Sequence, residues 1–217
     1  MTQHAATLRA AVIGDVIGSR QAEDREHLQQ SLRSCLAGVN EMVDAVQPLS
    51  VTLGDEFQGA YSAMGEALRA ALLLQATLKG TADLKIGIGW GELYFGDERS
   101  PLDQDGPCWW HARDALDSLR ERAGRHGVPQ SRRTACLTGT ASDDLIEGYL
   151  SVRDHIVSEL DALDGQILIG LASGRTQSEL AADLGLNKSS ISRRVHGHGI
   201  QSLIHSVPRR LPEEVSP

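Results

Sequence analysis

The chain has 217 residues, which is enough for one large domain or two small ones. Its apolar fraction of 41% is ordinary for a globular protein, and aromatic residues make up only 4%, so aliphatic side chains must build the core. The net charge of −8 argues against a protein coated in nucleic acid. Residues 175–210 nevertheless carry six Lys or Arg against two Asp or Glu, a net +4, which leaves −12 for the remainder. We therefore expect only the C-terminal part to approach an anionic partner.

Cysteine usage and hydropathy indicate where the protein works. The three cysteines, Cys35, Cys108 and Cys136, are odd in number and widely spaced, and they match neither a disulfide framework nor a zinc motif. The first residues do not form a charged-then-apolar signal segment, and no run approaches the roughly 20 apolar residues that span a bilayer. These features predict a cytoplasmic protein that does not enter a membrane.

Hydrophobic periodicity predicts alternating strands and helices in the first two thirds of the chain. Strands are expected at residues 8–13, 49–53, 56–61, 84–94 and 132–137, and helices at 22–46, 64–79 and 108–125. The order β-α-β-β-α-β-α-β is typical of an α+β protein with a ferredoxin-like sandwich, in which helices cover one face of an antiparallel or mixed sheet. In that layout the first strand lies beside the hairpin of residues 49–61.

Further helices are predicted in the C-terminal third, at residues 142–160 and 163–171, before a segment with helix-turn-helix spacing. Thr176 and Glu179 fit a capping box, Gly185 fits a turn, and Asn187 can cap the next helix. The pattern resembles the winged or resolvase-type helix-turn-helix of bacterial regulators. We accordingly expect two domains, an α+β domain at residues 1–150 and an all-α helix-turn-helix domain at residues 151–217.

The second helix of that motif is the candidate DNA-binding element. Its exposed residues are predicted to be Lys188, Ser189, Ser190, Ser192, Arg193 and Arg194. Serine and lysine near the start of such a helix can reach base edges or phosphates, and the arginines can bind the backbone or guanine. The weak affinity of a single copy favours a homodimer on paired half-sites. The alternative is a small three-helix bundle that contacts protein.

Two aspartates are the candidate metal ligands. Asp15 follows an apolar run, Asp55 follows another, and each adjoins a glycine-containing turn. Buried carboxylates need partners, and two that converge at strand ends would form the oxygen-rich site that Mg²⁺ favours. The alternative is purely local: Asp15 caps the following helix, and Asp55 occupies a tight turn.

Four motifs in order resemble the SatD family over nearly the whole chain: Asp15-Val-Ile-Gly-Ser-Arg20, Leu53-Gly-Asp-Glu-Phe-Gln58, Ile86-Gly-Ile-Gly-Trp-Gly-Glu92, and Asp105-Gly-Pro followed by Ala112-Arg113. The same motifs are more distantly similar to class III nucleotidyl cyclases and GGDEF domains. The sequence departs from those enzymes at two places. Trp110 stands where the cyclase helix carries Asn, and Leu53 replaces the first glycine of the GGDEF signature.

The likeness to cyclases implies roles for particular residues. Asp15 and Asp55 would hold Mg²⁺, and the backbone of Val16, Ile17, Gly18 and Ser19 would cradle the phosphates of a nucleoside triphosphate or other nucleotide. Arg113 would match the catalytic arginine that stabilises charge on the transferring phosphoryl group.

Three functions follow as hypotheses. The first is a DNA-binding regulator whose cyclase-like domain binds a nucleotide with Mg²⁺. The second is an active nucleotidyl cyclase or a related phosphoryl-transfer enzyme. The third is a transcription regulator whose first domain is catalytically dead and only dimerises.

Overall fold

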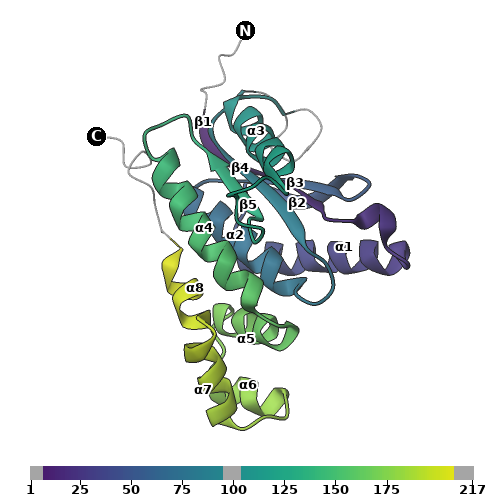
Figure 1. Ribbon diagram of the computed structural model, residues 1–217, viewed down its shortest axis with the longest axis vertical. Helices are drawn as coiled ribbons and strands as arrows, with labels where there is room; N and C mark the ends of the chain where they lie inside the picture. Colours follow the sequence, from purple (N-terminus) through teal and green to yellow (C-terminus); the bar gives the residue numbers. More distant parts are fainter. Residues whose placement is uncertain (1–6, 95–103, 208–217) are drawn as a thin grey trace.

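The computed structural model describes residues 7–94 and 104–207 of the chain (Figure 1). The elements in chain order are β1 (Thr7–Val16), the 3₁₀ turn η1 (Ser19–Gln21), α1 (Arg25–Met42), β2 (Gln47–Leu53), β3 (Glu56–Tyr61), α2 (Met64–Thr77), β4 (Leu84–Leu93), α3 (Pro107–Arg122), β5 (Thr134–Leu137), α4 (Asp143–Glu159), α5 (Ala162–Ala172), α6 (Gln177–Asp183), α7 (Lys188–Gly197) and α8 (Ile200–Ser206). The α+β class and the predicted order of the first eight strands and helices are confirmed. Helix α8 was not predicted.

The five strands form one mixed sheet in the order β2-β3-β1-β4-β5. The central strand β1 is antiparallel to β3 on one side and to β4 on the other, and β5 is parallel to β4. Strand β1 extends past the predicted end, because Asp15 still pairs with Lys85 of β4 and with Glu56 of β3. Three charged residues therefore lie side by side across three neighbouring strands.

Helices cover both faces of this sheet, so the prediction of helices on one face is wrong. Alternate residues of β1, such as Val12, face the core that α1 and α2 share. Ala11 and Ile13 face the opposite way and pack on Cys108, Trp109, Ala112 and Leu116 of α3.

The glycines of β4 explain why α3 takes that second face. A Cβ atom on Gly87 would lie 2.2 Å from the carbonyl oxygen of Ala112, and one on Gly89 would lie 2.1 Å from that of Cys108. A Cβ on Gly91 would meet Pro107 at 2.8 Å. Glycine at these alternate positions lets the backbone of α3 lie directly on the strand.

The C-terminal helices extend the core that lies beneath α1 and α2. Helix α4 contributes Ile146, Leu150 and Val157 to the same buried cluster. Helix α5 lies so close to α2 that a Cβ on Gly165 would be 2.4 Å from the carbonyl oxygen of Ala76. Figure 1 shows α6 and α7 at the end of the molecule away from the sheet, with α8 running back beside α4. The predicted boundary at residues 150 and 151 falls inside α4, and the division into two domains stays a prediction.

Within the two described ranges, we find no helix that combines the length and the hydrophobicity needed to span a bilayer.

The packing of α3 gives a first test. Gly89→Ala should lower the free energy of unfolding by about 3 kcal/mol, because the new methyl group meets backbone atoms of α3 that cannot rotate away. Gly148→Ala is the matched control, since a Cβ on this glycine of α4 has nothing within 4 Å. The control should be neutral or stabilise by about 0.5–1 kcal/mol. Urea unfolding of the three proteins measures both values, and equal stabilities would contradict the close contact.

Candidate functional site

A cleft of about 570 Å³ opens where β1 ends. Its lining residues are Asp15, Val16, Gly18, Ser19, Arg20, Gln21, Leu53, Asp55, Glu56 and Arg120. The structure thus brings both predicted metal ligands and three of the four predicted phosphate-binding residues to one place. Two residues predicted for the site, Ile17 and Arg113, are not part of this lining.

Asp15 is held in the cleft by an arginine of α3. Its Oδ2 accepts a hydrogen bond of 2.9 Å from Nη2 of Arg120, while Nη1 of the same arginine donates 2.8 Å to Asp117. The other carboxylate oxygen, Oδ1, is buried and has no hydrogen-bond partner among the described residues. A buried carboxylate oxygen without a donor is costly, which makes the Asp15 carboxylate a candidate to meet a cation or a donor at the cleft.

Asp55 is presented by the turn between β2 and β3. Gly54 has φ 62°, the left-handed region that glycine adopts freely. From α1, Nε2 of Gln29 donates 2.7 Å to the carbonyl oxygen of Gly54 and so fixes the turn. The Ser19 hydroxyl donates 2.5 Å to Oδ2 of Asp55. The turn after β1 and the hairpin turn are therefore joined across the cleft.

The backbone after β1 only partly matches the predicted phosphate cradle. The N–H of Ile17 donates 2.8 Å to the carbonyl oxygen of Asp83, so it is not directed at a ligand. Gly18 is left-handed at φ 71°, and η1 begins at Ser19. The amides of Gly18 and Ser19 remain the candidates for binding phosphate.

Arg113 forms a two-pronged ion pair with Glu56 at the side of the cleft. Its Nη1 and Nη2 donate 2.8 Å and 2.7 Å to the two carboxylate oxygens. These hydrogen bonds and the charge of the guanidinium hold the pKa of Glu56 below its usual value. The assignment of Arg113 to phosphoryl-group stabilisation stays a prediction, and in this arrangement its charge is balanced by Glu56.

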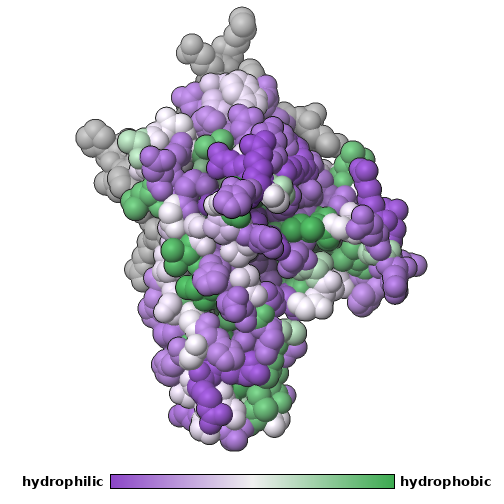
Figure 2. Space-filling model, in the orientation of Figure 1, coloured by the Kyte–Doolittle hydropathy of each residue, from purple (hydrophilic) through white to green (hydrophobic). Residues whose placement is uncertain are grey.

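Sequence reasoning missed how α3 takes part in the site. It assigned no role in the cleft to Glu56, Asp117 or Arg120. Arg113 and Arg120 are seven residues apart and share a helix face, which is the signal that could have directed both toward the sheet. Figure 2 shows a mainly hydrophilic surface over α3.

The donor set fits a cation that keeps water or phosphate ligands. No group of three or more His, Cys, Asp or Glu side chains able to hold a metal occurs in the described part of the chain. Mg²⁺ is usually bound by one or two carboxylates together with water and substrate phosphates. Asp15 and Asp55 fit that kind of site, and Oδ1 of Asp15 has no hydrogen-bond partner within residues 7–94 and 104–207.

The second candidate site is the helix pair α6 and α7. Oγ1 of Thr176 accepts the N–H of Glu179 at 3.2 Å, and Oδ1 of Asn187 accepts that of Ser190 at 2.8 Å, as the sequence predicts. The buried residues of the pair are Leu180, Ala181, Ile191 and Val195.

The predicted DNA-binding residues divide into two groups. Lys188, Ser189 and Arg193 are exposed, and Ser190 and Ser192 are half-buried. Arg194 instead turns toward α5, where its Nη1 donates 2.8 Å to Asp161 and 2.9 Å to the buried Asp164. The basic residues Arg209 and Arg210 lie outside the described residues.

The fold and the cleft together define an α+β protein with a carboxylate-lined cleft beside an α-helical extension. A scan against protein families matches residues 9–207 to the SatD family. The chain belongs to the SatD family.

Comparison with solved structures finds similarity to nucleotide cyclases. One is a bacterial light-regulated adenylyl cyclase at 12% identity and TM-score 0.41, covering 60% of this chain and 43% of that one. Another structure under the same description has 13% identity and TM-score 0.44, covering 66% and 80%. The guanylyl cyclase Cya2 has 14% identity and TM-score 0.41, covering 54% and 73%. A search of curated proteins finds no match. Similarity at this level says nothing of substrate or activity in this chain.

The Glu56–Arg113 pair gives a prediction about pH. Because the pKa of Glu56 is lowered in the folded state, its stabilising effect is complete above the usual value of 4.5 and is lost as the pH falls through the folded value. We expect Glu56→Gln to lower the free energy of unfolding by no more than about 1 kcal/mol near neutral pH, since the pair is partly exposed.

The free energy of unfolding at lower pH distinguishes the effect of the Glu56–Arg113 ion pair from a general effect of charge. The difference between wild type and Glu56→Gln should shrink between about pH 5 and about pH 3, as urea unfolding would show. Glu121→Gln, an exposed change on α3, is the control and should show little difference at either pH. A difference for Glu56→Gln that does not change with pH would contradict the assigned pair.

Proposed function

We propose that this SatD protein binds a nucleotide with Mg²⁺ in the cleft and binds DNA through α6 and α7. Nucleotide occupancy would then bias DNA binding. The observation that carries the proposal is the buried Oδ1 of Asp15, which lacks a partner among the described residues and belongs to the cleft that Asp55 also lines. A buried carboxylate in that state is expected to serve a ligand.

The residues that would hold Mg²⁺ are Asp15 and Asp55. When bound, the cation would neutralise phosphate charge in the cleft. The amides of Gly18 and Ser19 would take phosphate oxygens, because Gly18 turns the chain and η1 begins there. The guanidinium of Arg120 offsets the negative charge of Asp15, so the cleft is not uniformly acidic.

The geometry favours binding over turnover. Arg113, the residue that the likeness to cyclases assigns to catalysis, gives both of its terminal nitrogens to Glu56. To stabilise a transferring phosphoryl group it would have to leave this pair, which would expose the charge of Glu56 beside the cleft. An active nucleotidyl cyclase is therefore the second hypothesis, and nucleotide binding without turnover is the first.

The strand order β2-β3-β1-β4, with α1 and α2 on one face, supports a ferredoxin-like unit of the nucleotidyl-cyclase type. We assign residues 1–150 to this unit and residues 151–217 to a helix-turn-helix domain. The capped helices α6 and α7 support that second assignment.

The DNA-binding part rests on the exposed side of α7. Lys188 and Ser189 lie in its first turn and Arg193 lies farther along, all accessible to a duplex. Arg194, which pairs with Asp161 and Asp164, would position the helix instead of contacting DNA. A homodimer would place two copies of α7 on paired half-sites.

Thermal melting tests the cleft directly. With MgCl₂ and ATP or GTP at about 100 times Kd, ligand linkage stabilises by about 2.7 kcal/mol, which should raise Tm of the wild type by about 5–10 °C. Asp15→Asn and Asp55→Asn should lose most of this rise, because each removes a charge that Mg²⁺ needs. Asp114→Asn, an exposed change on α3, is the control and should keep it. A flat response of the wild type, or an equal rise in all four proteins, would contradict the nucleotide site.

Fluorescence anisotropy with a random-sequence duplex tests the helix pair. Arg193→Ala should weaken binding and reduce the slope of log K against log salt by about one, since one phosphate contact is lost. Arg33→Ala, an exposed arginine on α1, should leave binding unchanged. Unchanged binding in Arg193→Ala would contradict α7 as the DNA-binding element. If Mg²⁺ and nucleotide leave wild-type DNA affinity unchanged, the two sites are not coupled.

A further inference from the structure

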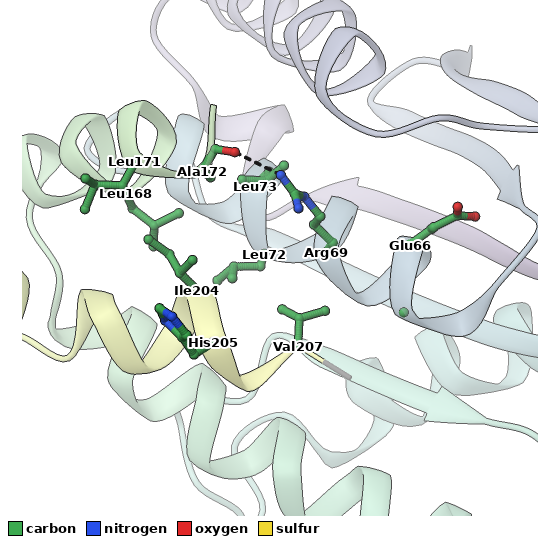
Figure 3. A pocket seen from close by; sticks show the side chains of 11 residues that line it. Glu66, Arg69, Leu72, Leu73, Leu168, Leu171, Ala172, Ile204, His205 and Val207 are labelled. Atoms are coloured by element: carbon green, nitrogen blue, oxygen red, sulfur yellow. Dashed lines mark hydrogen bonds between the residues drawn. The ribbon is translucent and has the colours of Figure 1, made fainter. Parts of the chain in front are cut away.

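A second cavity, which shares no lining residue with the cleft, lies where three helices that are distant in sequence meet. It has a volume of about 480 Å³ and is lined by residues of α2, α5 and the end of α8 (Figure 3). Cavities that bind small molecules commonly have volumes of roughly 300–1,000 Å³. We call this cavity the α2–α5–α8 groove.

The floor of the groove is aliphatic. Leu72, Leu73 and Leu168 are 2%, 1% and 0% exposed and belong to the main core. Leu171, Ile204 and Val207 pack against that core but stay half-buried. Apart from the imidazole of His205, the described residues that line the groove contribute no aromatic ring. Such a surface suits a flexible alkyl chain better than a flat ring, because ring stacking needs aromatic partners.

The rim of the groove carries a positive charge that is held in place. Arg69 is exposed, and its Nη2 donates 2.9 Å to the carbonyl oxygen of Ala172 at the end of α5. That bond uses one of the five N–H donors of the guanidinium. Figure 3 shows the bond and shows the side chain of Glu66 directed away from the leucines. The Glu66 carboxylate is engaged at the start of α2, where it accepts from the Ser62 hydroxyl at 2.9 Å and from the Ala63 N–H at 3.2 Å.

We propose that the α2–α5–α8 groove binds an amphipathic carboxylate with an unbranched alkyl chain of medium length, such as a free fatty acid. The chain would cover the half-buried Leu171, Ile204 and Val207, and the carboxylate would pair with Arg69. An anion is the matching charge because Glu66 is directed away from the leucines and the guanidinium of Arg69 keeps further N–H donors. This site is independent of the nucleotide cleft, and either could fail without the other.

Calorimetric titration of the full chain tests the alkyl part. Hexanoate, octanoate and decanoate, each below its micelle-forming concentration, should bind with Kd falling by about tenfold for every two added methylenes until the groove is full. Ile204→Trp should abolish binding, because the indole would fill the groove from the half-buried rim of α8. A Tm within a few degrees of wild type would show that this variant folds. Absence of saturable binding to any of the three acids overturns the proposal.

Changes of head group test the charged part. Arg69→Ala should weaken octanoate binding by about tenfold and leave 1-octanol binding unchanged. Arg33→Ala is the matched control and should bind octanoate like the wild type. Equal binding of octylammonium and octanoate, or unchanged octanoate binding in Arg69→Ala, overturns the assignment. A dimer in sedimentation that Ile204→Trp breaks would identify a second copy as the occupant and would also overturn it.

Discussion

Helix α3 lies directly on the glycines of β4, and the positions of the charged side chains at the cleft depend on that contact. Side chains at Gly87 or Gly89 would push the helix outward, since the space for a Cβ is already taken by its backbone. At the observed separation, Arg113 and Arg120 reach Glu56 and Asp15 on the neighbouring strands. A change of one methyl group under the helix would therefore alter both ion pairs at once, because packed interiors do not deform gradually. The glycines thus shape the site without touching a ligand.

The carboxylates at the cleft are balanced by arginines of α3. Asp15 and Glu56 are neighbours across two strands, and like charges in that position destabilise a sheet unless cations offset them. The two arginines of α3 supply those cations, and they do so unequally. Arg113 satisfies both oxygens of Glu56, whereas Arg120 satisfies one oxygen of Asp15 and leaves the other buried without a partner among the described residues. The unsatisfied oxygen therefore lies at Asp15, and Glu56 holds the helix.

The features that could be predicted from the sequence are those set by local rules. Strand alternation, helical spacing and the caps at Thr176 and Asn187 each depend on a few consecutive residues, and each is confirmed. The side of the sheet that α3 covers depends instead on its packing against β4, and the direction of Arg194 depends on a carboxylate 30 residues away. The buried pair of Arg153 and Asp154, each about 1% exposed, is equally hard to predict from the sequence. Asp154 accepts hydrogen bonds from the backbone N–H groups of Arg133 and Thr134, and no local pattern indicates this contact. These features depend on tertiary contacts, which patterns of neighbouring residues in the sequence do not determine.

Helix α5 packs against both α2 and α7. On one side it lies against α2, with Gly165 close to the backbone of Ala76. The buried carboxylate of Asp164 accepts a hydrogen bond from Arg194 and lies 2.8 Å from Nδ1 of His198. These two contacts hold the last turn of α7 against α5. Removing one partner of such a buried carboxylate is costly, and α7 is therefore expected to follow α5 instead of moving freely. A ligand that moves α2 relative to α5 would then also move the exposed face of α7, because α7 is packed on α5. Because the α2–α5–α8 groove is built at this joint, its occupant would act on the same pair of helices.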